Sequence, residues 1–256
     1  DIVFIDSALE CRDWKKCSSG YMTMDLMESN FGRSSFLQEG MTHRSICVFR
    51  HYTLLRTCVH SCSWDLNLAS MNQGIREMSI KQVEASMRLA AELEAMELTV
   101  HPGHMTLPGR REESMKLLQD SLEQIGRLSD RIGVDVSLEI MEKIPKEFVT
   151  DAQSMEEAAG SRKKQFFYTL DIAHCDSEEE PFHILDQLKR ISKIHISNRK
   201  GKCYHTPLGN GDFSFKEMLP QLLAYGLPLV TEGYDDSRDF HIFTENTAFL
   251  KTNGGL

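Results

Sequence analysis

The sequence predicts an α/β protein, a (β/α)8 barrel formed as a single domain over residues 1–256. From about residue 76 onward, amphipathic segments alternate with short β-prone runs, and this alternation predicts a parallel sheet. The weaker segments of the N-terminal third bring the count to eight strands, the number that closes a barrel. A length of 256 residues with 41% hydrophobic content is enough for one such core. An open doubly wound sheet is the alternative, but no glycine-rich phosphate turn follows the first strand.

The expected elements follow in chain order. The N-terminal third predicts strands near 2–5, 21–26 and 56–60, with helices near 8–17 and within 43–53, although Cys, Ser and Met interrupt these patterns. Further helices are expected at 76–95, 112–132, 151–160, 180–190, 214–225 and 239–252, because apolar side chains recur there at helical spacing. Strands are expected between them at 97–101, 134–139, 166–171, 192–196 and 228–232.

Composition limits the cellular setting and the partners. No apolar run approaches the roughly 20 residues of a membrane span, and the start of the sequence lacks the pattern of a signal peptide. Seven cysteines without framework spacing indicate reduced thiols, so we expect a cytoplasmic protein with no membrane partner. The formal charge of −9 disfavours indiscriminate binding of nucleic acid, although bound divalent cations would offset it.

Acidic residues and one histidine recur where the expected strands end. Because the carboxyl ends of parallel strands meet at one mouth of a barrel, these side chains are predicted to converge there. An isolated acidic residue at a strand end is more often a helix N-cap or a solvated loop group, but three acidic residues and one histidine at corresponding positions favour a metal site. Carboxylates and imidazoles suit Zn²⁺, Mn²⁺, Co²⁺ or Mg²⁺. The four predicted ligands are Glu139, Asp171, His195 and Glu232.

Further histidines lie near the same strand ends. Each of His60, His101, His174 and His205 taken alone could simply be hydrogen-bonded. Their joint placement favours function, because His60 and His101 on adjacent strands could share an ion with Glu139. His174 and His205 could share another ion or hold a substrate oxygen.

Four other residues near the expected mouth have open interpretations. Trp64 lies in a loop over the mouth, where it could stack on a ring or cap the barrel edge. Arg199 could meet a substrate phosphate. Glu142 and Lys143 could orient Glu139, or they could form surface pairs. The segment 209–213 indicates a turn before a helix rather than a phosphate-binding loop.

Together these segments resemble the xylose-isomerase-like barrel superfamily, which contains sugar-phosphate isomerases and epimerases and also endonuclease IV. The resemblance extends from about residue 56 to 235. It rests on Asp-Leu-Asn-Leu-Ala-Ser at 65–70, Val-His-Pro-Gly-His at 100–104, Leu-Asp-Ile-Ala-His at 170–174, Ile-His-Ile-Ser at 194–197, His-Thr-Pro-Leu-Gly-Asn-Gly-Asp-Phe at 205–213 and Thr-Glu-Gly-Tyr at 231–234.

The resemblance implies one to three bound ions. In the isomerase and epimerase members, one ion is held by residues that match Glu139, Asp171, His195 and Glu232. In endonuclease IV, three zinc ions use this set together with histidines that match His60, His101, His174 and His205. That enzyme also has an Asp two residues before the last histidine, where this chain has Cys203.

The sequence therefore favours a divalent-metal-dependent isomerase or epimerase of a sugar or sugar phosphate. Glu139 and Glu232 would transfer the proton through a metal-stabilised enediolate, while His174 and His205 orient substrate hydroxyls. The alternative is an endonuclease IV-like phosphodiester hydrolase acting on abasic-site DNA, the only interpretation with DNA as a partner. Cys203, the acidic charge and the lack of recognisable DNA-penetrating loops stand against it. A non-catalytic sugar-binding barrel is a lesser alternative. A homo-oligomer is compatible with the sequence.

Overall fold

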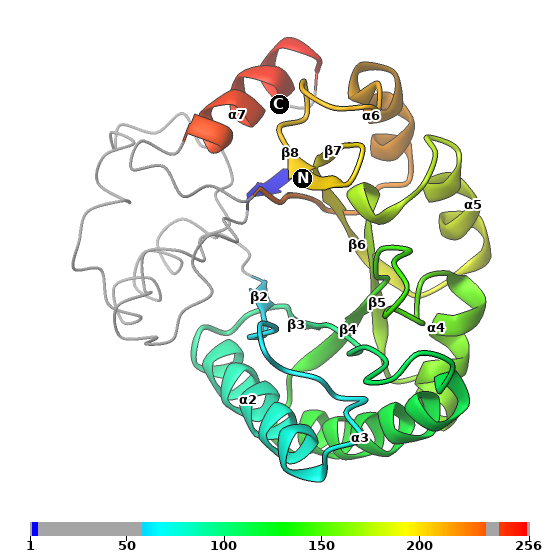
Figure 1. Ribbon diagram of the computed structural model, residues 1–256. Coiled ribbons are helices and arrows are strands. Elements are labelled where there is room, and N and C mark those ends of the chain that lie inside the picture. Colours follow the sequence, from blue (N-terminus) through cyan, green and yellow to red (C-terminus); the bar gives the residue numbers. More distant parts are fainter. Residues whose placement is uncertain (1, 5–57, 234–240, 255–256) are drawn as a thin grey trace. The chain divides into compact units, whose positions relative to one another are not determined.

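The computed structural model describes residues 2–4, 58–233 and 241–254 (Figure 1). The chain forms two compact units. Residues Cys58–Ser192 make up the central unit, and Asp1–Thr57 together with Lys193–Leu256 make up the terminal unit. The segments expected at 8–17, 21–26 and 43–53 lie outside the described residues, and the expectation of one domain stays a prediction.

The central unit is built on a parallel sheet with the strand order β2-β3-β4-β5. Its strands are β2 (Val59–His60), β3 (Glu97–Val100), β4 (Asp135–Glu139) and β5 (Phe167–Asp171). In register, Leu98 lies opposite Val136, and Leu138 lies opposite Tyr168. These strands are buried along almost their whole length, as expected for parallel strands that are covered on both faces.

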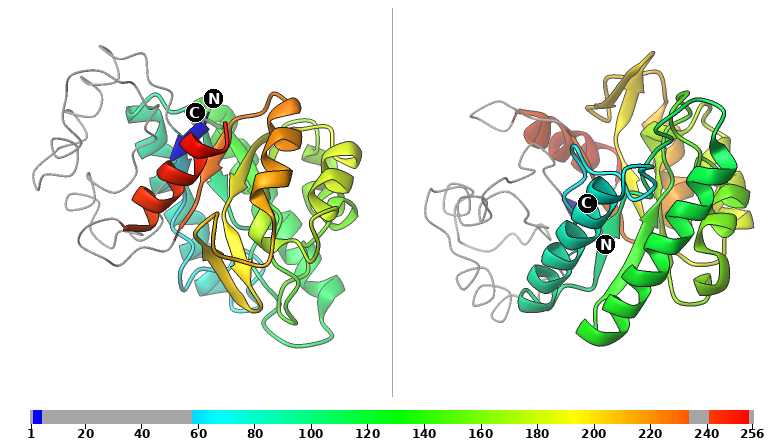
Figure 2. Two further views of the ribbon diagram at one scale, coloured as in Figure 1. Left: turned by 90° about the horizontal axis from the view of Figure 1, so that it is seen from above. Right: turned by 60° about the horizontal axis from the view of Figure 1, so that its bottom comes forward.

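Four helices belong to the central unit: α2 (Gln73–Glu92), α3 (Arg111–Ile132), α4 (Ala152–Ala159) and α5 (Glu180–Gln187). Helix α2 begins after Asn72, whose side chain accepts hydrogen bonds from the backbone amides of Gly74 and Ile75. Helix α3 ends at Gly133, whose φ of 81° forms a left-handed cap. In Figure 1 α2, α3 and α4 lie along the same side of the strands, and Figure 2 shows α2 and α3 side by side. Short 3-10 helices follow α4 (Gly160–Arg162) and β5 (Ile172–His174).

In the terminal unit the parallel strands lie in the order β1-β9-β6. Its strands are β1 (Ile2–Phe4), β9 (Leu229–Thr231) and β6 (Ile191–Ile196), and the last of these begins in the final residues of the central unit. Helices α6 (Phe215–Ala224) and α7 (His241–Thr252) complete it. An antiparallel hairpin of β7 (Asn198–Lys200) and β8 (Cys203–Thr206) follows β6.

The helices and strands expected beyond residue 76 are all present, with boundaries shifted by a few residues. The hairpin β7-β8 was not expected, because its strands are short and polar and show no apolar alternation. Among the described residues, no helix combines the length and apolar character that crossing a membrane requires.

Candidate metal centre

The candidate ligands of the central unit occupy the carboxyl ends of neighbouring parallel strands. His60 ends β2, Glu139 ends β4 and Asp171 ends β5, while His101 follows β3 directly. The sheet register aligns these ends, since His60 lies opposite Thr99 and Glu139 lies opposite Thr169. Strand pairing therefore places these residues along one edge of the sheet.

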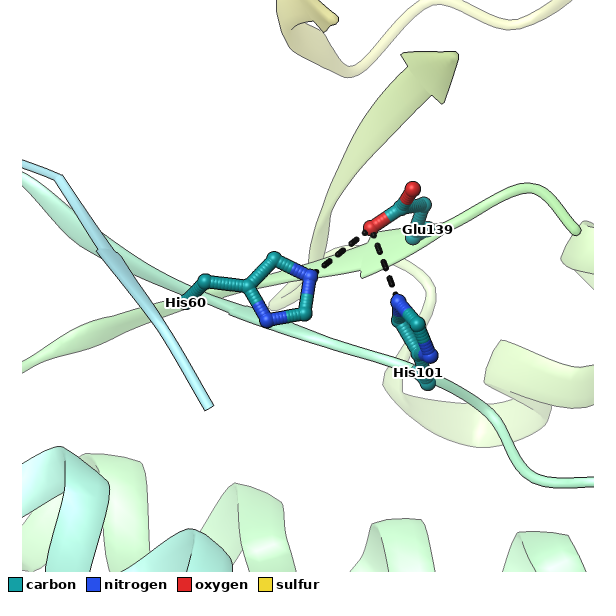
Figure 3. A group of neighbouring side chains, drawn as sticks. All are labelled: His60, His101 and Glu139. Carbon is teal, nitrogen blue, oxygen red and sulfur yellow. Dashed lines mark hydrogen bonds and ion pairs between the residues drawn. The ribbon is translucent and has the colours of Figure 1, made fainter. Parts of the chain in front are cut away.

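His60, His101 and Glu139 come together at this edge (Figure 3). Oε2 of Glu139 lies 3.2 Å from Nε2 of His60 and 3.4 Å from Nε2 of His101. The two imidazole rings meet edge to face, with 4.8 Å between their centroids. The Glu139 side chain is only 1% exposed, so its carboxylate oxygen is shared by two histidines away from bulk water.

The orientation of His60 identifies which of its nitrogens can bind a cation. Nδ1 lies 2.8 Å from the backbone carbonyl oxygen of Ser61, which can only accept a hydrogen bond. Nδ1 therefore carries a proton, and the Nε2 of a neutral ring presents its lone pair to the carboxylate of Glu139. Two acceptors face each other in that state, so either a proton or a metal cation must lie between them.

These separations suit a metal ion. Ligand atoms about 2.0 to 2.1 Å from a tetrahedral Zn²⁺ lie roughly 3.4 Å from one another. The contacts of Glu139 Oε2, at 3.2 and 3.4 Å, match this spacing. Histidine ligands of metals also commonly donate their second ring N–H to a carbonyl, as His60 does. The residues present therefore fit a divalent cation.

His174 has the same type of support. Its Nδ1 lies 2.8 Å from the carbonyl oxygen of Ile140, so that nitrogen carries the proton and Nε2 is the ligand atom. The ring is buried, with Nδ1 3.9 Å from Oε1 of Glu139 and Nε2 3.8 Å from Oε2 of Glu142. His174 thus lies beside the second carboxylate oxygen of Glu139.

Asp171 acts in part as a helix cap, the common role of an acidic residue at a strand end. Its Oδ1 accepts a hydrogen bond of 2.7 Å from the backbone amide of Ala173 and caps the 3-10 helix after β5. The residue is fully buried. Capping occupies one oxygen of the carboxylate and fixes its orientation.

The loop after β4 carries buried acidic groups. Burial raises the pKa of the Glu147 carboxyl to about 7, and the nearby charge of Glu142 adds to this rise. Burial also lowers the pKa of His104, and the charge of Lys146 lowers it further. Lys143 pairs with Glu180 and, at 3.5 Å, with Asp176, which agrees with the surface-pair interpretation of this lysine.

In the terminal unit, His195 and Glu232 come together after β6 and β9. Nδ1 of His195 lies 2.8 Å from Oε2 of Glu232, and both residues are buried. His205 on β8 has a φ of +59°, a conformation that is uncommon outside glycine, and its Nδ1 lies 3.0 Å from the hydroxyl of Ser197. Cys203 on the same strand is exposed.

Asn198 fixes the β7-β8 hairpin to the segment before α6. Its side-chain amide donates to the carbonyls of Leu208 and Phe213, and its Oδ1 accepts from the backbone amides of Arg199 and Phe213. The segment 209–213 is thus a turn leading to α6, as predicted. Within the hairpin, the guanidinium of Arg199 lies over the ring of Tyr204 and donates to the carbonyl of Gly201.

The indole of Trp64, in the loop after β2, is 57% exposed, and its predicted role in stacking on a ring stays a prediction. The convergence of Glu139, Asp171, His195 and Glu232 on one cation stays a prediction. Sequence reasoning missed the partners that orient the histidines, namely the carbonyls of Ser61 and Ile140 and the hydroxyl of Ser197.

A family model for the xylose isomerase-like TIM barrel matches residues 35–252. The chain belongs to this family. The predicted (β/α)8 class and the resemblance to this superfamily are thereby confirmed. An uncharacterised protein of Methanocaldococcus jannaschii is 25% identical over 217 residues, covering 78% of this chain and 73% of that protein.

Two further proteins with a named activity are similar to this family member. A probable endonuclease 4 of Mycobacterium leprae is 24% identical over 219 residues, covering 79% of this chain and 81% of that protein. The crystal structure of a D-tagatose 3-epimerase-like protein superposes with a TM-score of 0.73 at 22% identity, covering 84% of each chain. The first of these proteins is named as a probable endonuclease. The likeness to the second, at 22% identity, shows the fold.

Proposed function

We propose that this chain is a divalent-metal-dependent phosphodiester hydrolase that cleaves DNA at abasic sites. The observation that carries the proposal is the position of His60 and His101 on one oxygen of Glu139, with the His60 lone pair fixed toward that oxygen. A single-ion isomerase needs only the four ligands at 139, 171, 195 and 232. Two additional histidines on the same carboxylate support a centre with more than one ion, and this reverses the preference that the sequence alone suggested.

Glu139 would hold one cation with His60 and His101, whose ring nitrogens lie beside its Oε2, and a second cation with Asp171, His195 and Glu232. When bound, such cations supply positive charge to a phosphodiester and lower the pKa of water. Burial of Glu139 keeps its charge unscreened, and the carbonyl of Ser61 keeps His60 in the required tautomer.

Two residues would contact the substrate itself. The exposed indole of Trp64 would stack on a base or a sugar ring, and the guanidinium of Arg199, held over Tyr204, would bind a phosphate. His205, oriented by Ser197, would bind either a cation or a substrate oxygen through Nε2.

Cys203 favours a second candidate, a sugar or sugar-phosphate isomerase or epimerase. It stands where the resemblance to endonuclease IV requires an Asp, and it lies exposed on β8. The third zinc set of that enzyme would therefore lack its carboxylate. In this candidate Glu139 and Glu232 would remove and return a proton on opposite sides of a bound sugar, and His174 would orient a hydroxyl.

One experiment separates the two candidates. The zinc-loaded and manganese-loaded chain is incubated with a labelled duplex bearing one abasic site, and in parallel with a panel of ketoses in deuterated water. We expect cleavage at the abasic site and no deuterium in the sugars. An intact duplex beside deuterated sugar would overturn the hydrolase in favour of the isomerase, and no reaction in either arm would overturn both.

Matched variants tie the activity to the proposed site. His101→Ala should abolish cleavage, whereas His183→Ala, which removes an exposed histidine on α5, should leave it unchanged. An equal effect of the two changes would contradict the assignment of His101.

A further inference from the structure

His60 and His101 are held in different ways. His60 is oriented by the carbonyl of Ser61, whereas the imidazole of His101 lies against the carboxylate of Glu139 and the ring of His60, the two groups that would share a cation with it. Its side chain is 30% exposed. The backbone that presents the His101 ring lies in the loop 101–104 after β3.

In loop 101–104, the residue type restricts the backbone at His101 but not at Gly103. Pro102 restricts the preceding His101 to extended conformations. Gly103 then turns the chain with a φ of +87°, where a side chain would be strained. Something outside the loop has to fix the chain beyond this glycine.

Asn67 supplies that restraint from the loop after β2. Its Nδ2 donates to the carbonyl of His104 at 2.8 Å, and its Oδ1 accepts from the backbone amide of His104 at 3.0 Å. The same Oδ1 accepts from the amide of Ala69 at 2.9 Å. The buried side chain of Asn67 therefore hydrogen-bonds to both the backbone carbonyl and the backbone amide of His104, and also to the loop in which Asn67 itself lies.

Asn67 is itself anchored and closely packed. The backbone amide of Asn67 donates to the hydroxyl of Ser79 on α2, and that hydroxyl donates to the carbonyl of Ile75. A Cβ added at Gly103 would lie 2.6 Å from Oδ1 of Asn67 and 2.8 Å from the amide nitrogen of Leu68. The glycine is thus required both by its φ and by the approach of Asn67.

We propose that Asn67 is a positioning residue that fixes loop 101–104 and thereby presents the His101 imidazole to a cation bound with His60 and Glu139. This inference rests on the metal site of the proposed function. Asn67 binds no cation itself. It lowers the cost of ordering His101 when the cation binds, so its loss should weaken cation binding only where His101 takes part.

The test is a double-mutant cycle read by calorimetric titration of the chelator-stripped full chain with Zn²⁺. The variant Asn67→Asp keeps the size of the side chain but places a carboxylate oxygen against the carbonyl of His104. We expect zinc affinity to fall at least about tenfold in the wild-type background, within the range known for residues that support a metal ligand. In the His101→Ala background the same change should have no further effect.

Two further variants keep the test decisive if Asn67→Asp folds poorly. Gly103→Ala disturbs the same loop from the other side, and should reproduce the selective loss of zinc affinity. Asn72→Ala removes an exposed cap of α2 and serves as the control, because it lowers stability without touching loop 101–104. Thermal unfolding in chelator establishes that each variant is folded.

The outcomes separate this inference from the proposed function. An equal loss of affinity in both backgrounds, or no loss in either, would overturn the role of Asn67. If His101→Ala itself leaves zinc binding unchanged, the metal site of the proposed function fails, and the positioning role fails with it. If His101→Ala lowers zinc affinity but Asn67→Asp and Gly103→Ala do not, the metal site is supported and only the positioning role of Asn67 is refuted.

Discussion

In the central unit, two candidate ligands are oriented by main-chain carbonyls, whereas in the terminal unit His205 is oriented by a side chain. The carbonyls of Ser61 and Ile140 hold His60 and His174, and the hydroxyl of Ser197 holds His205. A carbonyl is present whatever side chain stands at that position. The support of His60 and His174 is therefore built into the backbone, while the contact of Ser197 with His205 depends on a replaceable side chain.

The two units also differ in backbone conformation at their histidines. His205 adopts a φ of +59° in a hairpin that Asn198 fixes to the next turn. His60 ends a regular strand, and His101 is restrained by Asn67 and Pro102. Strained backbone persists only where the surroundings hold it, so we expect the terminal unit to be more sensitive to single substitutions around its histidine.

The largest effect is expected where two histidines of the central unit share one carboxylate. Glu139→Gln removes the negative charge that faces both imidazoles, so zinc affinity should fall by more than about 100-fold, exceeding the usual loss on removing a supporting residue. Metal content by mass spectrometry and calorimetry would measure this. Glu113→Gln on the exposed surface of α3 is the matched control. Retention of wild-type zinc content in Glu139→Gln would break the account of the central unit.

The next effect concerns pH and the buried acid of the central unit. Because the pKa of Glu147 is raised from 4.5 to about 7, the folded state binds more protons than the unfolded state between these values. Its contribution to stability is therefore fully present below pH 4.5 and is lost as the pH rises through about 7. Because a difference of one in pKa corresponds to about 1.4 kcal/mol, the unfolding free energy should fall by about 3 kcal/mol over this pH range.

Glu147→Gln should remove this pH dependence. Relative to the wild type, the variant should gain unfolding free energy between pH 5 and pH 8, as measured by urea denaturation in chelator. The comparison of the two proteins cancels the titration of other groups. Parallel stability curves for both proteins across this range would contradict the burial of a protonated Glu147.

The smallest effect tests the difference between the units directly. Ser197→Ala removes the partner of His205 Nδ1, and should lower activity about tenfold, the lower bound for loss of a residue that supports a ligand. Ser197→Thr, which keeps the hydroxyl, should restore it. Ser61→Ala is the counterpart in the central unit and should change little, because the carbonyl that holds His60 remains. Equal losses from Ser61→Ala and Ser197→Ala would erase the proposed contrast.

Much of the fold followed from the sequence because burial imposes a period on it. The helix over Gln73–Glu92 buries Ile80, Val83 and Met87, which recur at helical spacing. The strand ends at His60, Glu139 and Asp171 followed from the same alternation. The hairpin Asn198–Thr206 did not, because its residues are polar and its pairing is set by Gly201 and the Asn198 contacts rather than by apolar burial.

The candidate site could be predicted only at the level of its ligands. Residue types at strand ends indicate a metal centre, since side chains carry that chemistry. The groups that orient them left no such signal, because the carbonyls of Ser61 and Ile140 are common to all residues. Asn67 lies in the segment Asp-Leu-Asn-Leu-Ala-Ser at 65–70, which carries part of the family resemblance. Its contact with His104 could not be predicted, because the two residues are 37 positions apart and only the fold brings their loops together.

Cation binding by His60, His101 and Glu139 can be observed by anomalous scattering from crystals of the full chain grown with zinc and recorded at the zinc edge. We predict an anomalous peak within bonding distance of Nε2 of His60, Nε2 of His101 and Oε2 of Glu139. Well-ordered density for these three side chains without an anomalous peak among them, at saturating zinc, would contradict it.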